Sequence, residues 1–141
     1  MKRETFISLT ISRLDVLPAY VALGGMFGAL ARYVLSGLIQ NGRYFPAGTL
    51  GVNVIGSFFL GFFMFSSEYF GLFSQEVRAF IAIGFLGSFT TMSTFSYESF
   101  RLLSEGNLIY FLANVLLNVA GCIAAVYAGR AFALALWRMV M

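Results

Sequence analysis

Apolar residues along the chain gather into four long runs, which short polar stretches separate. The runs occupy residues 19–39, 47–65, 79–100 and 108–129, and the second and fourth contain no charged residue. Each is close to the roughly 20 residues with which an α-helix crosses about 30 Å of hydrocarbon. Strands of a membrane barrel would be about half as long and would alternate apolar with polar positions, which these runs do not. The pattern predicts an all-α membrane protein with four transmembrane helices.

The connections between the runs are short. They occupy residues 40–46, 66–78 and 104–107. In the second connection, Ser74 is a candidate N-cap for the third helix, with Glu76 in its first turn. Too little chain lies outside the runs to form a soluble catalytic or nucleotide-binding domain. We therefore expect a single transmembrane domain at 19–141, preceded by a tail at 1–18.

Composition and charge agree with this picture. The 141 residues are 60% hydrophobic and 11% charged, and the mean hydropathy is +0.85. The net charge of +3 comes from basic residues scattered along the chain, which is not the pattern of a nucleic-acid-binding surface. The chain contains no histidine, which removes the commonest general base and the commonest metal ligand.

The tail lacks the continuous apolar centre and the small-residue cleavage site of a signal peptide, so we interpret it as a cytoplasmic or interfacial segment. Outside the runs, six basic residues lie in the tail, the second connection and the C-terminal segment, whereas Arg43 lies in the first connection and Arg101 lies just before the third. This bias favours an N-terminus on the inner side of the membrane.

Polar residues within three of the runs recur every four positions, which places them on one face of each helix. The stripes are Thr49, Asn53, Ser57 and Gly61 in the second run, Thr90, Thr94 and Glu98 in the third, and Asn114, Asn118 and Cys122 in the fourth. A buried amide without a partner costs on the order of a few kcal/mol, so we expect the three faces to turn toward one another or toward water. Their amide and hydroxyl donors, together with phenylalanine ring edges, suit a small anion that is bound only moderately.

Packing alone is the alternative for several of these residues. Gly24 and Gly28 form a GxxxG pair, which usually lets two helices approach closely, and hydroxyls often bond to carbonyls of their own helix. Glu98 lies three residues before Arg101, so an interfacial ion pair is an alternative for it. For Arg32, a cation within the first run, two interpretations stay open: it extends toward the nearer membrane surface, or it lies at an aqueous vestibule and attracts anions.

The third run contains Gly84 and Gly87 followed by Ser-Phe-Thr-Thr, a poor sequence for a continuous helix. A break there would leave backbone carbonyls free at mid-membrane, where such backbone is tolerated in buried or water-lined sites and often binds an ion. A cation held by carbonyls is therefore a candidate feature of the break. The runs show no internal repeat, and four helices enclose little space, so a homodimer is the simplest complete assembly.

Three motifs taken together resemble the Fluc fluoride channel family, also known as CrcB proteins. They are GGMFGALARY (24–33), GTLGVNVIGSFFLG (48–61) and GFLGSFTTMSTFSYE (84–98). The resemblance covers all four spans and implies an antiparallel dual-topology homodimer with a broken third helix. It implies a passive, fluoride-selective channel with two pores per dimer and a central structural sodium ion. The expected location is the inner membrane of a prokaryotic cell, with fluoride, lipid and a second copy as partners and no nucleic acid.

The resemblance also assigns residues. Sodium would bind the backbone carbonyls of Gly87 and Thr90 from both subunits. The fluoride pathway would contain Arg32, Thr49, Asn53, Met92, Ser93, Thr94, Phe95, Ser96, Glu98 and Asn118. Within it, Asn53 would donate its amide to fluoride and Phe95 would offer a ring edge. Met92 stands where the family usually has phenylalanine, and its thioether has no positive ring edge.

The main alternative is a small proton-coupled multidrug exporter, because such exporters are also four-helix, dual-topology dimers. They depend on an acidic residue in the first helix, where this chain has Arg32. An intramembrane lipid enzyme would need a base beside a serine nucleophile, and the spans contain neither histidine nor lysine, so we expect no enzymatic activity. A purely structural packing subunit is a third alternative.

Overall fold

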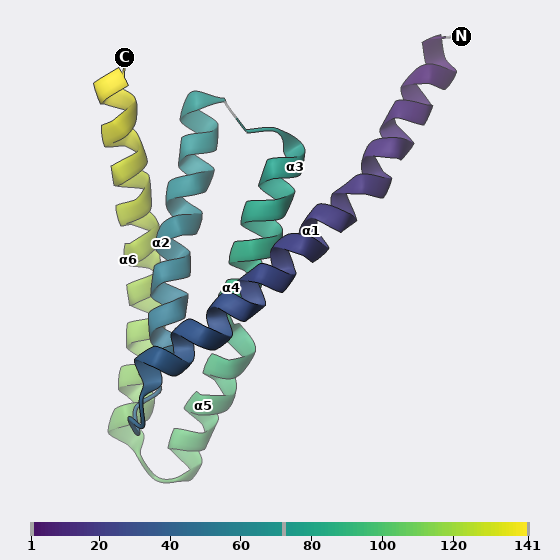
Figure 1. Cartoon of the computed structure of the whole chain (residues 1–141). Helices are drawn as coiled ribbons and strands as arrows, with labels where there is room; N and C mark the ends of the chain where they lie inside the picture. The colour runs from purple at the N-terminus through teal and green to yellow at the C-terminus, as the bar shows by residue number, and fades with distance from the viewer. Residues whose placement is uncertain (1, 72, 141) are drawn as a thin grey trace.

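The computed structural model describes residues 2–71 and 73–140, with side chains from Val16 onward. Its elements are α1 (Lys2–Gln40), α2 (Ala47–Phe70), α3 (Gln75–Arg78), the π-helix η1 (Ala79–Leu86), α4 (Gly87–Phe89), α5 (Met92–Ser104) and α6 (Leu108–Val140) (Figure 1). Four stretches are long and apolar enough to cross a membrane: Val16–Gln40, Ala47–Phe70, Gln75–Ser104 and Leu108–Val140. Every described element is helical, so the predicted four-helix membrane architecture is confirmed.

Three helices extend beyond their predicted runs. The tail expected at 1–18 is helical from Lys2 and continues through Pro18 into the first span. Proline inside a helix removes one backbone hydrogen bond and crowds the carbonyl four residues earlier, so it often kinks or ends a helix, yet α1 continues through Pro18. α2 and α6 continue past Glu68 and Arg130, which are exposed and therefore keep their charges outside the packed interior.

Close approach through glycine joins α1 to the first half of the third span. A Cβ atom added at Gly24 would lie 2.2 Å from the carbonyl oxygen of Phe80, and one at Gly28 would lie 2.1 Å from that of Phe85. From the other side, a Cβ at Gly84 would lie 2.7 Å from the Val21 carbonyl oxygen. The packing interpretation of the GxxxG pair is therefore confirmed, and Gly84 belongs to the same contact.

Glycine also joins α2 to α6, which run side by side in Figure 1. A Cβ atom at Gly61 would lie 2.6 Å from the carbonyl oxygen of Val126, and one at Gly129 would lie 2.3 Å from that of Phe58. These contacts let the polar stripes of the two helices come within hydrogen-bonding distance. Gly61 therefore contributes close helix packing, which brings the polar residues of α2 near α6, and makes no polar side-chain contact itself.

The third span begins and breaks close to where the sequence predicts. The Ser74 side chain caps α3 by accepting a hydrogen bond from the Val77 N–H at 3.4 Å, which confirms the predicted cap. The break lies between α4 and α5, at Thr90 and Thr91. It is not at Gly84, which remains helical because its missing side chain serves the contact with α1.

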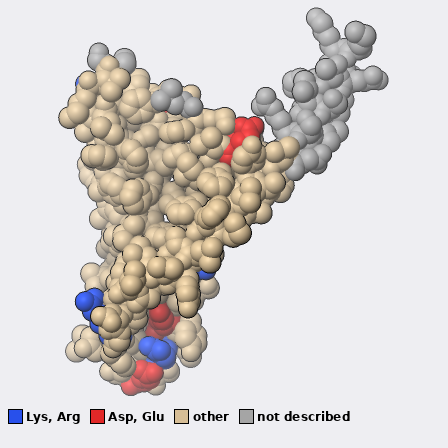
Figure 2. All heavy atoms as spheres, viewed as in Figure 1, with Lys and Arg blue, Asp and Glu red and all other residues tan. Residues whose placement is uncertain are grey.

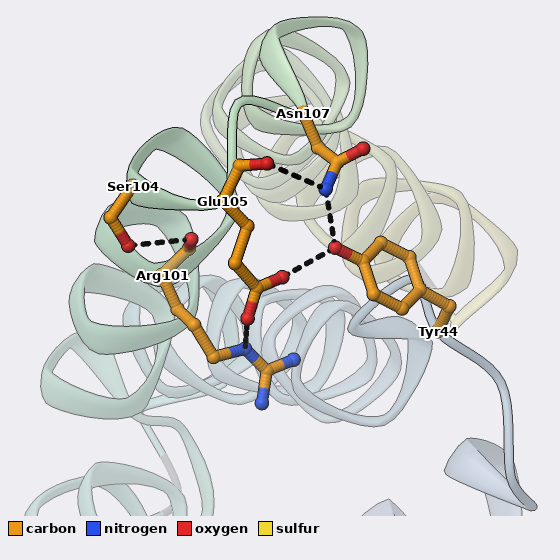
Figure 3. Close-up of polar contacts among 5 residues, drawn as sticks. All are labelled: Tyr44, Arg101, Ser104, Glu105 and Asn107. Carbon is orange, nitrogen blue, oxygen red and sulfur yellow. Dashed lines mark hydrogen bonds and ion pairs between the residues drawn. The ribbon is translucent and has the colours of Figure 1, made fainter.

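One end of the bundle is closed by polar contacts between two loops (Figure 3). Tyr44, in the α1–α2 loop, donates a hydrogen bond to the Glu105 carboxylate and accepts one from the Asn107 amide. Arg101 Nε lies 3.7 Å from Glu105 Oε1. The close salt bridge of Arg101 is therefore with the exposed Glu105, one turn further along, and not with Glu98, which is attracted by the charge of Arg101 without forming a close ion pair with it. Figure 2 shows the visible charged side chains mainly at this lower end, below a largely uncharged body.

Replacing Tyr44 with phenylalanine should alter stability at alkaline pH. The hydrogen bond to Glu105 raises the pKa of Tyr44, because the carboxylate favours the protonated phenol. A raised folded-state pKa stabilises the fold fully below the ordinary value of about 10, and this stabilisation is lost as pH rises through the folded-state value. We expect Tyr44→Phe to lower Tm by no more than about 4 °C at pH 8 and to flatten the fall in Tm above pH 10. Thermal melts in detergent measure both; parallel pH profiles would contradict the assignment.

Candidate functional site

Asn53 of α2 fills the gap in the third span. Thr90 (φ −84°, ψ 157°) and Thr91 (φ −148°, ψ 114°) have extended backbone. The Thr91 N–H donates to Asn53 Oδ1 at 2.8 Å, and Asn53 Nδ2 donates to the Thr91 carbonyl at 3.2 Å. The side-chain amide thus replaces the backbone partners that the break removes, at a buried position inside a membrane span.

The break also releases two carbonyls from their usual helical donors. In a continuous helix the Thr91 N–H would bond to the carbonyl of Gly87, and the Thr94 N–H to that of Thr90. Here the Thr91 N–H bonds to Asn53 and the Thr94 N–H bonds to Thr91 Oγ1 at 3.3 Å. Gly87 and Thr90 are the two residues to which the family resemblance assigns sodium. Released carbonyl oxygens are ligands that suit a hard cation, so the local backbone fits that assignment.

A line of side-chain hydrogen bonds runs from Asn53 into α6 and then α5. Asn53 Nδ2 donates to Asn118 Oδ1 at 3.0 Å, and Asn118 Nδ2 donates to Asn114 Oδ1 at 2.9 Å. Asn114 Nδ2 donates to Ser99 Oγ at 3.0 Å, and Ser99 Oγ donates to the Phe95 carbonyl at 2.7 Å. All of these side chains are buried. The expectation that the amide-bearing faces turn toward one another is confirmed.

Asn53 and Asn118 also line a groove of about 290 Å³ beside the break. Its other lining residues are Ser57, Leu60, Thr90, Thr91, Met92, Phe95, Val119 and Cys122. Met92 is 71% exposed, whereas Phe95 is 7% exposed. Within one chain, the thioether of Met92 therefore projects freely and the ring of Phe95 is largely covered.

Arg32 lines a second pocket, of about 250 Å³, together with the hydroxyl-bearing residues Ser36, Thr49 and Thr94. Among the described residues, none of those that line this pocket is acidic. Thr91 lines both hollows, so both border the helix break. The structure thus brings Arg32, Thr49 and Thr94 together on one side of the break, and Asn53, Asn118, Met92 and Phe95 on the other.

The remaining predicted pathway residues lie on α5. Ser93 Oγ lies 3.3 Å from Thr91 Oγ1, and Ser96 Oγ donates to the carbonyl of Met92, in its own helix, at 2.9 Å. Glu98 is half-buried, and its Oε2 atom is buried without a hydrogen-bond partner among the described residues. The carboxylate also receives a hydrogen bond from the Thr49 side chain and is attracted by Arg101, so Oε2 is the part of the group that the described residues leave without a partner. An acidic group inside a span is costly and is typical of a functional position.

Comparison with known proteins identifies the family to which these features belong. Residues 19–130 match the family described as CrcB-like protein, Camphor Resistance (CrcB). The chain belongs to the CrcB family. The match covers all of α2, the whole third span and most of α6, so the helix break and both hollows lie inside the CrcB region.

Several CrcB relatives carry a functional name. Fluoride-specific ion channel FluC 1 of Methanosarcina acetivorans is 54% identical over 115 residues, which are 81% of this chain and 88% of the relative. Fluoride-specific ion channel FluC of Methanocaldococcus jannaschii is 49% identical over 118 residues, or 84% and 94% of the two chains. That of Geobacter sulfurreducens is 49% identical over 111 residues, or 77% and 90%.

These names are those of ion channels, which agrees with the expectation that this CrcB protein is not an enzyme. They give no support to the multidrug-exporter alternative. Together with the four apolar helices, they identify a multi-pass membrane protein.

Three residues of the site were not among the residues predicted for the pathway. Thr91 caps α5 and lines both hollows, Asn114 is completely buried at the centre of the hydrogen-bond line, and Ser99 receives that line on α5. The four-residue stripe already placed Asn114 beside Asn118, so its spacing was the available signal. Nothing in the sequence marked Ser99 apart from the other hydroxyls of the third run.

Proposed function

We propose that this chain forms a fluoride-selective passive anion channel. The observation that carries the proposal is that two hollows border the helix break, one lined by Arg32 with several hydroxyl-bearing residues and the other a mainly apolar groove that contains the amides of Asn53 and Asn118. Hydroxyl and amide donors with little fixed charge can replace water around an anion while still releasing it. The names of the CrcB relatives point to fluoride as that anion.

Asn53 is the donor on which the proposed pathway depends most. Its Nδ2 group already donates to the Thr91 carbonyl and to Asn118 Oδ1. A fluoride ion in the groove would accept the hydrogen bond that Asn53 now donates to Asn118. An anionic acceptor would then replace a neutral one. Charge-assisted hydrogen bonds are roughly twice as strong as neutral ones, which favours entry of the ion. When the ion leaves, the hydrogen bond from Asn53 to Asn118 forms again, which keeps binding reversible.

Hydroxyl groups on α5 and Thr49 of α2 would carry the ion along the rest of the pathway. Thr94 and Thr49 line the Arg32 pocket, and the exposed Ser93 and Ser96 lie on the same helix as Thr94. Hydroxyl rotors can turn a hydrogen toward a passing anion without moving the backbone. Arg32 would raise the local anion concentration at the entrance.

The proposed functional unit is an antiparallel dual-topology homodimer with two pores. Within one chain, α5 leaves Met92, Tyr97 and Phe100 exposed at 71%, 66% and 68%. A second copy crossing at the break would cover part of this face. It would also bring a second set of released Gly87 and Thr90 carbonyls to the centre, where they would hold a structural sodium ion. The bound cation would supply the positive charge that the clustered carbonyl dipoles need.

The proposed transport is passive, in the inner membrane of a prokaryotic cell. In acid surroundings neutral HF crosses lipid and dissociates inside the cell, where fluoride accumulates. A negative-inside potential then drives the anion outward, with about 2.3 kcal/mol per 100 mV for each charge. Narrowness and hydrogen-bond donors suited to a small, hard ion would exclude chloride.

Ion efflux from liposomes that contain the purified protein tests this function. Liposomes loaded with potassium fluoride or potassium chloride are diluted into buffer free of potassium and halide, valinomycin is added to let potassium leave, and each anion is followed with its own electrode. We expect rapid fluoride release and chloride release that is slower by at least about 100-fold, as for a site whose donors fit only the smaller ion. Equal release of the two anions would refute selectivity, and release of neither would refute the channel.

A further inference from the structure

Asn114 occupies a position that the proposed anion pathway does not explain. Its side chain is 0% exposed, and it is not among the lining residues of either hollow. Its amide nevertheless makes contacts on both sides: Oδ1 accepts from Asn118 at 2.9 Å, and Nδ2 donates to Ser99 Oγ at 3.0 Å. A fully satisfied polar side chain in an apolar bundle fixes the relative position of the groups that it joins.

The direction of every bond in this line is set at the helix break. Because the Thr91 N–H can only donate, it fixes Oδ1 of Asn53 as its acceptor, so the Nδ2 group of Asn53 faces Asn118. Asn118 must then present Oδ1 to Asn53 and Nδ2 to Asn114, which leaves Nδ2 of Asn114 for Ser99. The asparagines therefore form one oriented chain of donors from the break to the middle of α5.

α5 depends on this line of hydrogen bonds because α5 is sparsely packed within the protomer. Its buried residues are Phe95, Ser99 and Leu102, a single stripe that faces α6. Among the described residues, Asn114 to Ser99 is the only hydrogen bond between the side chains of α6 and those of α5. The remaining polar contacts of α5 with the rest of the protomer lie at Thr91, at Glu98, whose carboxylate is hydrogen-bonded by the Thr49 side chain, and at the Glu105 loop junction.

We propose that Asn114 and Ser99 are positioning residues that hold α5 at the angle required for anion binding at Asn53. This inference rests on the proposed function. When an anion accepts the hydrogen bond that Asn53 donates to Asn118, Asn118 loses a donor. The resulting shift of its amide passes to Asn114 and reaches α5 through the hydrogen bond to Ser99. The apparent affinity for fluoride therefore depends on Asn114 and Ser99, although neither touches the ion.

Planar-bilayer currents measured over a series of fluoride concentrations test this proposal, with Asn114→Leu, Ser99→Ala and the double variant. Each single variant should raise the half-saturating fluoride concentration by roughly 3- to 10-fold, the effect of one net hydrogen bond. Because both changes cut the same contact, the double variant should be shifted no further than the more affected single variant. Ser104→Ala is the matched control: its hydroxyl bonds only to the Arg101 carbonyl in its own helix, and it should not shift the curve.

Thermal melting of the same preparations separates positioning from simple stability. Single variants that lower Tm while the half-saturating concentration stays within two-fold of the unmutated value would overturn the proposal and leave the channel function intact. A double variant with additive shifts would also overturn it. Absence of fluoride current from the unmutated protein would instead overturn the proposed function, and with it this inference.

Discussion

Asn53→Leu should reduce fluoride release from liposomes by roughly 100-fold or more while the protein still folds and keeps the oligomeric state of the unmutated protein. Leucine has a similar volume but cannot bond to the Thr91 N–H or to the Thr91 carbonyl. A buried backbone group left unpaired costs about 1–3 kcal/mol, so the Thr91 N–H would tend to recover its helical partner, the carbonyl of Gly87. The variant would therefore lose the pathway donor and also close the break from which the carbonyls of Gly87 and Thr90 are released.

Asn107→Leu is the matched control for this variant. It makes the same chemical exchange in the α5–α6 loop, where the amide donates to the Tyr44 hydroxyl and lies away from both hollows. We expect it to conduct fluoride normally. Size-exclusion chromatography reports whether each variant keeps the oligomeric state of the unmutated protein. Asn53→Leu channels that release fluoride at the unmutated rate would show that the helix break does not need its side-chain partner, and would revive the packing interpretation of the polar stripes.

Gly28→Ala should strongly destabilise the protein, by about 3 kcal/mol, the upper end of the usual cost of overpacking, because added atoms cannot be absorbed at a contact made of backbone. The new methyl group would lie 2.1 Å from the Phe85 carbonyl oxygen and 3.0 Å from the Phe85 Cα atom. Neither atom can turn aside as a flexible side chain would, so α1 and η1 must separate. A fall in Tm of about 10 °C or more is expected in thermal melts of the detergent-solubilised protein.

The same substitution at Gly37 provides the control on the same helix. A Cβ atom there would meet nothing within 4 Å, and the residue lies inside α1. Alanine favours a helix by about 1 kcal/mol over glycine, so Gly37→Ala should leave Tm unchanged or raise it slightly. Equal melting curves for the two variants would show that α1 and η1 are not packed as closely as the structure has them.

The helical spans could be predicted because each apolar run is as long as a membrane crossing requires. The same physics predicted a break in the third span, but placed it around the glycines. Helix propensity marks Gly84 and Gly87 as weak points, whereas the tertiary contact between Asn53 and Thr91 decides where the backbone leaves the helix. Propensity is a local quantity, and that contact joins residues 38 positions apart.

The hydrogen-bonded site was likewise predictable where local spacing decides and not where a tertiary contact decides. Four-residue spacing placed Asn114 and Asn118 on one face, and the cost of an unpaired amide predicted that they would find partners. Spacing alone does not say which hydroxyl of α5 lies opposite, so Ser99 was not distinguished. For Arg101, helical geometry allowed an acidic partner at either neighbouring turn, and the freedom of the exposed Glu105 decided between them.

The order of the helix break and its partner along the chain has a consequence for biogenesis. Asn53 leaves the ribosome before Thr91, so the second span is already in the bilayer when the interrupted one is inserted. The Thr91 N–H and carbonyl can then bond to the Asn53 side chain as the third span enters the membrane. They need not remain unpaired in lipid, where each unpaired peptide group would cost several kcal/mol. A circular permutant that starts at the third span would reverse this sequence of events and should insert with a lower yield.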